Sequence, residues 1–205
     1  VEAVLVKESC RRSYSRRAGE ELALYLDKNN IPGVEGIDTR TLTLHLRQSG
    51  TLYGAISTVE KNPVLLRERV VAYKESNRRD LVKEVATDVI KEWPAGGAVL
   101  PGLERMGPVD TTRNGSHIVV YDFGIKYNIL RHLAVRGCRI SLVPYDAPLD
   151  RIYQLKPDGI VLSNGPGDPS DQRRFIPALR ELIGHYPIFG ICLGHQLLAL
   201  ALGHS

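Results

Sequence analysis

Cys192 stands between two glycines, Gly190 and Gly194, where one apolar run ends and another begins. Residues 188–191 suit a buried strand, and residues 196–202 suit a helix. A strand, a tight turn and a helix form the elbow on which many hydrolases carry a serine nucleophile, here replaced by cysteine. The glycines fit because a strained turn leaves no room for Cβ atoms. We therefore expect Cys192 to be a nucleophile rather than a core cysteine.

A second loop suited to chemistry covers residues 163–169, which read Ser-Asn-Gly-Pro-Gly-Asp-Pro after an apolar run. Its glycines, Gly165 and Gly167, let the backbone approach a ligand and expose N–H groups. One such N–H can pair with the N–H of Leu193 to form an oxyanion hole. On composition alone, a simple Gly/Pro turn is the competing interpretation. The Gly-Lys-Ser/Thr end of a Walker loop is missing, and no GxGxxG occurs.

A cysteine nucleophile also needs a base within hydrogen-bond reach. The chain has six histidines, at positions 45, 117, 132, 185, 195 and 204. His195 follows the elbow directly, but we interpret it as structural, and His204 lies beyond a helix that leads away. The sequence thus supplies a nucleophile and an oxyanion hole without an evident base.

The elements that must position these loops alternate regularly in the second half of the chain. Strands are predicted at 118–121, 139–143, 159–162 and 188–191, and helices at 126–136, 149–155, 175–183 and 196–202. Apolar strands separated by helices indicate a doubly wound α/β fold, with a mostly parallel sheet covered on both faces. Sites in such sheets form at the carboxyl ends of the strands. The loops after Asp122, at 163–169 and at Cys192 all leave those ends.

The first half predicts a smaller, mixed α/β domain. Helical patterns cover 20–26, 41–46, 63–74 and 81–93, and residues 52–58 look like a strand. Asp38 or Thr39 is a suitable N-cap for the second helix. Residues 94–115 are crowded with glycine and proline and read as a linker. We therefore expect a first domain at 1–93, a linker at 94–115 and a second domain at 116–205.

Composition favours an ordinary globular protein. The 205 residues are 43% hydrophobic and 24% charged, with a net charge of +4. The basic cluster at positions 11, 12, 16 and 17 reads as a solvated loop, so we expect no nucleic-acid partner. Cys10, Cys138 and Cys192 form no disulfide framework, which indicates a reducing compartment. No signal peptide or membrane-spanning stretch is visible, so we expect a cytoplasmic protein without membrane association.

The two loops together resemble a known family. Residues 190–196, which read Gly-Ile-Cys-Leu-Gly-His-Gln, and the upstream loop 163–169 are similar to class I glutamine amidotransferases. Residues 121–131 resemble the opening strand and helix of that domain in carbamoyl-phosphate synthetase small subunits. Residues 36–50 and 80–85 resemble the preceding domain of the same subunits. The resemblance covers nearly the whole chain.

The resemblance implies a flavodoxin-like amidotransferase domain that hydrolyses L-glutamine through a thioester on Cys192. It implies that Gly165 and Leu193 donate N–H groups to the oxyanion, and that Gly165, Gly167, Leu193 and Gln196 contact glutamine. Ammonia would pass to a large subunit, which makes carbamoyl phosphate for arginine and pyrimidine biosynthesis with ATP and Mg²⁺. No cofactor or metal is implied on this chain.

The chain departs from the family pattern in its extent. The family's catalytic histidine and glutamate lie downstream of the elbow, and we expect an early glutamine-contacting serine of the first domain to be absent as well. The sequence therefore looks like an internal fragment, expected to be inactive alone. Two alternatives stay open: another class I amidotransferase or cysteine hydrolase on the same fold, and a catalytically incomplete module that binds a partner.

Overall fold

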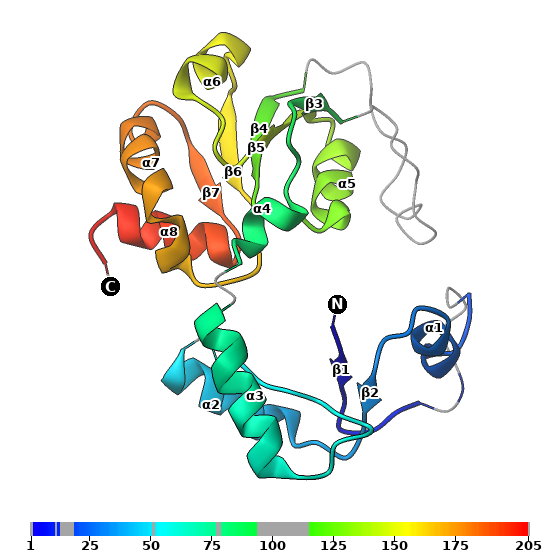
Figure 1. The fold of residues 1–205 in the computed structure, drawn as a ribbon. Coiled ribbons are helices and arrows are strands. Elements are labelled where there is room, and N and C mark those ends of the chain that lie inside the picture. The colour runs from blue at the N-terminus through cyan, green and yellow to red at the C-terminus, as the bar shows by residue number, and fades with distance from the viewer. Residues whose placement is uncertain are drawn as a thin grey trace. The chain divides into compact units, whose positions relative to one another are not determined.

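The structure is a computed structural model that describes residues 2–10, 12, 19–50, 52–76, 79–93 and 115–204. The chain divides into two compact units, residues 1–78 and 79–205. Figure 1 shows the elements of both units.

The first unit is small, mixed α/β and lightly packed. Its described elements are β1 (Val4–Leu5), α1 (Leu22–Lys28), β2 (Gly33–Val34), α2 (Thr39–Ser49) and α3 (Pro63–Ser76). Strands β1 and β2 pair in parallel. The three helices bury none of their described side chains.

The helices predicted for this unit are confirmed, but the strand is not. Asp38 caps α2, since its Oδ1 accepts the Thr41 N–H at 2.9 Å. Residues 52–58 form no strand. In a strand, Leu52 and Ile56 would lie on one face and Tyr53 on the other, yet all three are about two-fifths exposed. The segment therefore has no single apolar face to bury, and a strand needs one as well as a partner.

The second unit contains the alternation that the sequence predicts. Its elements are α4 (Leu81–Val85), β3 (Lys91–Glu92), β4 (His117–Asp122), α5 (Tyr127–Val135), β5 (Arg139–Pro144), α6 (Leu149–Leu155), β6 (Gly159–Leu162), η2 (Pro169–Phe175), α7 (Ile176–Leu182), β7 (Ile188–Gly190) and α8 (Leu193–Ala201). The four predicted strands and four predicted helices are confirmed, although α8 begins three residues earlier than expected.

The sheet of this unit has the order β3-β5-β4-β6-β7. All neighbours are parallel except β3, which runs antiparallel to β5. The chain moves from β4 outward to β5 and then crosses back to β6 on the other side. Because the winding reverses there, the crevice at the carboxyl ends of β4 and β6 is the topological switch point, where flavodoxin-like sheets bind ligands.

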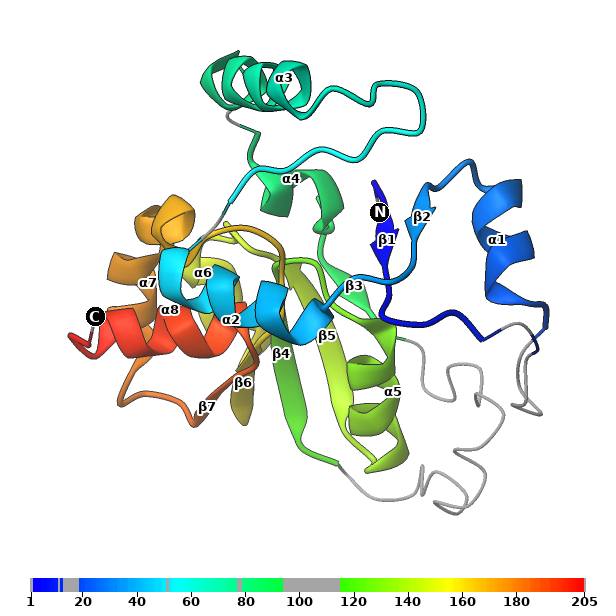
Figure 2. The same ribbon diagram turned by 90° about the horizontal axis from the view of Figure 1, so that it is seen from below.

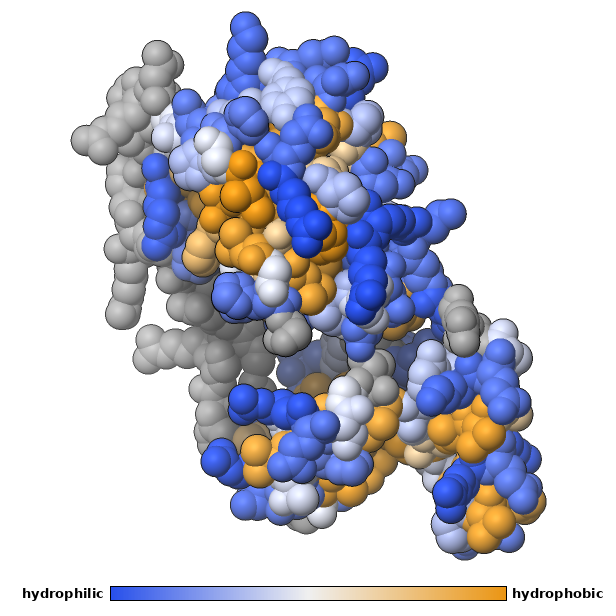
Figure 3. Space-filling model, turned by 90° about the vertical axis from the view of Figure 1, so that its left-hand side faces the viewer, coloured by the Kyte–Doolittle hydropathy of each residue, from blue (hydrophilic) through white to orange (hydrophobic). Residues whose placement is uncertain are grey.

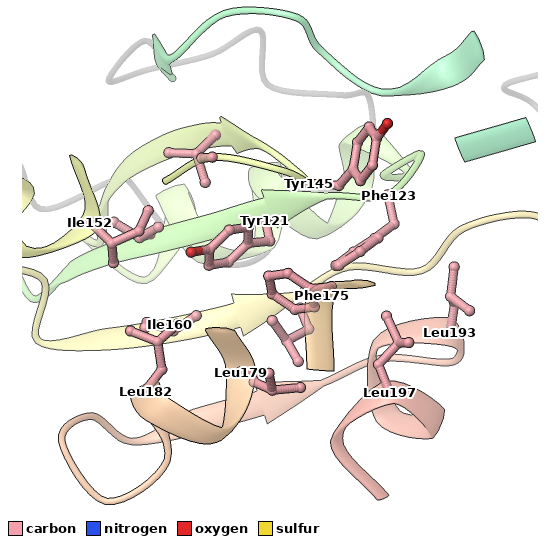
Figure 4. Packing of buried hydrophobic residues seen from close by; sticks show 14 of the residues in the cluster. Tyr121, Phe123, Tyr145, Ile152, Ile160, Phe175, Leu179, Leu182, Leu193 and Leu197 are labelled. Carbon is pink, nitrogen blue, oxygen red and sulfur yellow. The ribbon is translucent and has the colours of Figure 1, made fainter. Parts of the chain in front are cut away.

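Helices cover both faces of the sheet, as the doubly wound fold requires (Figure 2). Side chains of β4 alternate: Val119 and Tyr121 pack with α6, α7 and α8, whereas Val120 packs with α5. Figure 4 shows the larger cluster, in which the ring of Phe175 packs against the rings of Tyr121 in β4 and Phe123 just after β4. Its ring centroid is 4.9 Å from that of Tyr121 and 5.3 Å from that of Phe123, both edge-on.

Residues 79–93 pack with the second unit, although the sequence pattern predicts them in the first domain. The helix predicted over 81–93 is wrong beyond Val85, because β3 pairs with the edge of β5 instead. The buried side chain of Val82 belongs to the larger core cluster. The expected linker at 94–115 lies outside the described residues except for Gly115.

Strand β7 ends the described sheet on the side opposite β3. Phe189 on β7 is 65% exposed, and Leu202 just after α8 is 58% exposed. Figure 3 shows apolar side chains gathered on the side of this unit where α7 and α8 lie in Figure 1. No helix among the described residues is long and apolar enough to cross a membrane.

Candidate active site

Cys192 occupies a strained turn between β7 and α8. Its backbone has φ 51° and ψ −111°, a conformation that L residues adopt rarely and mostly at functional sites. The side chain is exposed and its thiol is free. The N–H of Gln196 donates to the Cys192 carbonyl at 3.0 Å, which makes Cys192 the N-cap of α8. The predicted elbow is therefore present, with its cysteine at the tip.

The two elbow glycines are required by close backbone approaches. A Cβ on Gly190 would lie 2.6 Å from the carbonyl oxygen of Gly194. A Cβ on Gly194 would lie 2.3 Å from the carbonyl oxygen of Leu162, at the end of β6. Real Cβ atoms do not approach so closely. The sequence expectation that this turn has no room for side chains is confirmed.

The loop at 163–169 docks directly on the elbow. The Ile191 N–H donates to the Leu162 carbonyl at 2.9 Å, and the Gly194 N–H donates to the Ser163 carbonyl at 3.1 Å. A Cβ on Gly165 would lie 2.8 Å from Cδ2 of Leu193 and 2.3 Å from the carbonyl oxygen of Phe123. The structure thus brings Gly165 and Leu193, the two residues expected to donate N–H groups, side by side.

Neither of these N–H groups is paired in the described part of the second unit. Within residues 115–204, the N–H groups of Gly165 and Leu193 have no hydrogen-bond acceptor. Leu193 is the first residue of α8, and the first N–H groups of a helix have no partner inside it. Their partial positive charge favours an anion at the helix start. Unpaired N–H donors are the kind of group that an oxyanion requires.

The other predicted glutamine contacts lie near this pair. Gly167 has φ 87°, which favours glycine, and an added Cβ there would meet nothing closer than 3.9 Å. Gln196 is exposed in the first turn of α8, three residues after Leu193 and so on a neighbouring part of the helix surface. Both residues are exposed.

The buried carboxylate of Asp122 braces the third loop at this edge. Its Oδ1 accepts the N–H groups of Gly124 and Ile125 at 2.8 and 2.9 Å, and its Oδ2 accepts the Thr87 N–H at 2.9 Å. The side chain of Asn164 reaches the same loop, donating to the Gly124 carbonyl at 2.9 Å. Neither side chain was predicted from the sequence to have a role. An aspartate that ends a buried strand, and an asparagine before a glycine, were the available signals.

No histidine in the described part of the chain is hydrogen-bonded to Cys192. His195 is exposed on α8, and His132 contacts Arg136 at the end of α5. His117 is buried at the amino end of β4, where its Nε2 is 2.8 Å from the hydroxyl of Ser141. Burial lowers the pKa of His117. Since the reactive loops leave the carboxyl ends, His117 lies at the wrong end of its strand to serve Cys192.

The remaining cysteines have no comparable setting. Cys138 is half-buried against the α5 side of the core, and burial raises the pKa of its thiol. Cys10 is exposed in the first unit. Among the residues that the structure describes, no three His, Cys, Asp or Glu side chains are grouped as a metal site.

Two family models match separate parts of the chain. Residues 119–205 match the class-I glutamine amidotransferase model. Residues 1–56 match the model of the carbamoyl-phosphate synthase small chain, CPSase domain.

Curated relatives extend the match over almost the whole chain. The carbamoyl phosphate synthase small chain of Syntrophotalea carbinolica is 43% identical over 200 residues, which is 97% of this chain and 52% of that protein. The small chains of Porphyra purpurea and Bacillus caldolyticus are each 40% identical, over 98% and 99% of this chain and 53% and 50% of theirs. The chain spans about half the length of the curated relatives it matches, and it belongs to the carbamoyl-phosphate synthase small-chain family, with residues 119–205 in its class-I glutamine amidotransferase portion.

Proposed function

We propose that this chain carries the nucleophile and oxyanion donors of a glutaminase that supplies ammonia for carbamoyl phosphate synthesis. The observation that carries this proposal is the placement of exposed Cys192 in a strained elbow beside two unpaired N–H groups, those of Gly165 and Leu193. The family membership narrows the substrate to glutamine. The glutamine side chain would lie at the switch point, near Gly167 and Gln196.

In the proposed reaction, the Cys192 sulfur attacks the carboxamide carbon of glutamine as a thiolate. The carbonyl electron pair moves to oxygen, and the resulting oxyanion accepts hydrogen bonds from Gly165 and Leu193. When the intermediate collapses, the C–N bond breaks and the nitrogen takes a proton to leave as ammonia. Water then attacks the γ-glutamyl thioester, and the C–S bond breaks to release glutamate and the thiol.

The proton carrier for these steps is a separate part of the proposal. No histidine among the described residues is hydrogen-bonded to Cys192. We assign the base to a histidine and glutamate pair downstream of the elbow in the full-length protein, as the family resemblance implies. On this assignment, the 205 residues alone should turn over glutamine negligibly, since loss of one member of a catalytic triad can cost on the order of 10⁴-fold or more in rate.

The partner in the proposal is a large synthetase subunit. Ammonia released at Cys192 would pass to that subunit, which would bind ATP and Mg²⁺ and carry out the ligase chemistry in the cytoplasm. Several relatives bear the name carbamoyl phosphate synthase small chain, which supports a complementary large chain.

A paired assay tests this function. Cys192→Ser in the full-length chain, assembled with its synthetase partner, should abolish carbamoyl phosphate synthesis from glutamine and retain synthesis from ammonium. Cys10→Ser is the matched control, because Cys10 is also an exposed, free cysteine. Retention of the glutamine-dependent rate by Cys192→Ser would exclude this nucleophile. Absence of synthesis from either nitrogen source in the unmutated complex would exclude the proposed function.

A further inference from the structure

Ser163, which precedes the Asn-Gly pair, is fully buried and uses its hydroxyl twice. Its Oγ accepts the Phe123 N–H at 2.9 Å and donates to the Asn164 carbonyl at 2.7 Å. The hydroxyl proton therefore has a defined acceptor, and the oxygen has a defined donor. Both partners are backbone groups of loops that leave the switch point.

The Asn164 carbonyl belongs to the same peptide unit as the Gly165 N–H. A trans peptide is planar, so its C=O and N–H bonds point in opposite directions. Fixing the oxygen therefore fixes the direction of the N–H. The Ser163 hydroxyl acts on the Gly165 N–H through this geometry, without touching it.

The side chain of Asn164 holds the same peptide unit from a second direction. Its Nδ2 donates to the Gly124 carbonyl at 2.9 Å, and its Oδ1 accepts the Lys126 N–H at 3.1 Å. A carbonyl partner and an N–H partner together fix which end of the amide is which. The loop that receives these bonds is itself closed on the buried carboxylate of Asp122.

We propose that Ser163 is a positioning residue, which aims the Gly165 N–H at the oxyanion by holding the carbonyl of the same peptide unit, with Asn164 as its second anchor. This inference rests on the proposed function. It also accounts for the hydrogen bonds that tie two successive residues, Ser163 and Asn164, to the loop after β4. A free peptide unit beside a glycine would turn easily, because glycine restricts neither φ nor ψ strongly.

Ser163→Ala tests the proposal, and Ser141→Ala is its matched control. Ser141 is equally buried, and its hydroxyl also has two partners, His117 and Glu92. Both variants lose a buried hydroxyl, but Ser141 lies within β5, away from the reactive loops. In the full-length complex, we expect Ser163→Ala to lower the glutamine-dependent kcat by about 10- to 100-fold with little change in KM. Complete loss of one oxyanion donor costs roughly 10²- to 10³-fold. Ammonium-dependent synthesis should be unchanged in both variants.

Asn164→Ala provides a second variant that removes only a half-exposed side chain, with exposed Asn128→Ala on α5 as its control. It should lower kcat in the same way. Crystal structures give a readout apart from activity: the peptide unit joining Asn164 to Gly165 should turn, or occupy two orientations, in Ser163→Ala and stay fixed in Ser141→Ala. An unchanged peptide unit, or a kcat loss no larger than in Ser141→Ala, would overturn the inference. If the unmutated complex does not use glutamine, the proposed function fails, and the orientation of the peptide unit still decides the role of Ser163.

Discussion

The backbone N–H of Thr87 donates to the side chain of Asp122 at 2.9 Å, although the two residues are 35 positions apart and the expected linker lies between them. This bond joins the segment before the linker to the strand that opens the amidotransferase portion. The same segment continues through β3 into the sheet. The amidotransferase portion therefore has a structural element that precedes the expected linker in the chain.

Truncation of Val82 should destabilise the second unit. Val82 in α4 is 2% exposed and packs in the larger core cluster, whereas Val85 on the same helix is 55% exposed. Val82→Ala should lower the free energy of unfolding by about 1.5–3 kcal/mol, from lost burial and the cavity left behind. Val85→Ala should change it by less than about 1 kcal/mol. Urea unfolding followed by the emission of Trp93, the single tryptophan, measures both. Equal effects would show that α4 does not pack as described.

Asp122→Asn should also destabilise the unit. The two carboxylate oxygens together accept three N–H groups. An amide in their place has one oxygen to accept with, and its NH2 group would face an N–H that has lost its acceptor. A buried donor without a partner costs about 1–3 kcal/mol. Asp146→Asn, at an exposed position in the turn after β5, should be neutral. Thermal unfolding of the two variants checks the difference, and equal melting temperatures would contradict it.

The sheet and the elbow could be predicted from the sequence because each has a strong local signal. Apolar strands end at loops rich in glycine, and Cys192 lies between glycines that the backbone packing requires. The position of Gly165 beside Leu193 also follows, since the carboxyl ends of adjacent parallel strands share one edge.

The structure of residues 86–93 and the roles of Ser163 and Asn164 depend on contacts between residues distant in sequence. Residues 81–93 have helical periodicity, but beyond Val85 the N–H of Thr87 and the strand β3 find partners on β4 and β5 instead. Tertiary bonds override local propensity there. The bracing roles of Ser163 and Asn164 were also hidden, because the Phe123 N–H and the Gly124 carbonyl that they bind belong to a loop about 40 residues earlier.

Gly194→Ala should disrupt the elbow. Its Cβ would lie 2.3 Å from the Leu162 carbonyl oxygen, so either α8 or β6 must shift. Overpacking of this kind costs about 1–3 kcal/mol. In Gly159→Ala, by contrast, the nearest atom would be an ordinary 3.4 Å away. Unfolding free energies from urea titration compare the two. The idea of a tightly packed elbow would be wrong if Gly194→Ala were as stable as Gly159→Ala.

The buried histidine makes the stability of the second unit depend on pH. His117 is 4% exposed, and its pKa is lowered chiefly by burial and then by the charge of Arg139, against the opposing effects of Glu92 and Asp158. When the pH falls below about 6.5, the usual histidine pKa, the unfolded chain takes up a proton that folded His117 does not. Stability is then lost as the pH falls from there toward the lowered folded pKa.

His117→Gln should remove this part of the pH dependence. Its amide can still donate to the Ser141 hydroxyl, which His117 Nε2 contacts at 2.8 Å, but it cannot titrate. Between about pH 7.5 and 5.5, the range in which histidines usually titrate, we expect the free energy of unfolding to fall more steeply for the unmutated chain than for the variant. Urea titrations at several pH values in this range provide the measurement. Parallel curves for the two proteins would show that His117 takes up its proton as readily in the folded state as in the unfolded one, and that burial at the amino end of β4 does not control its charge.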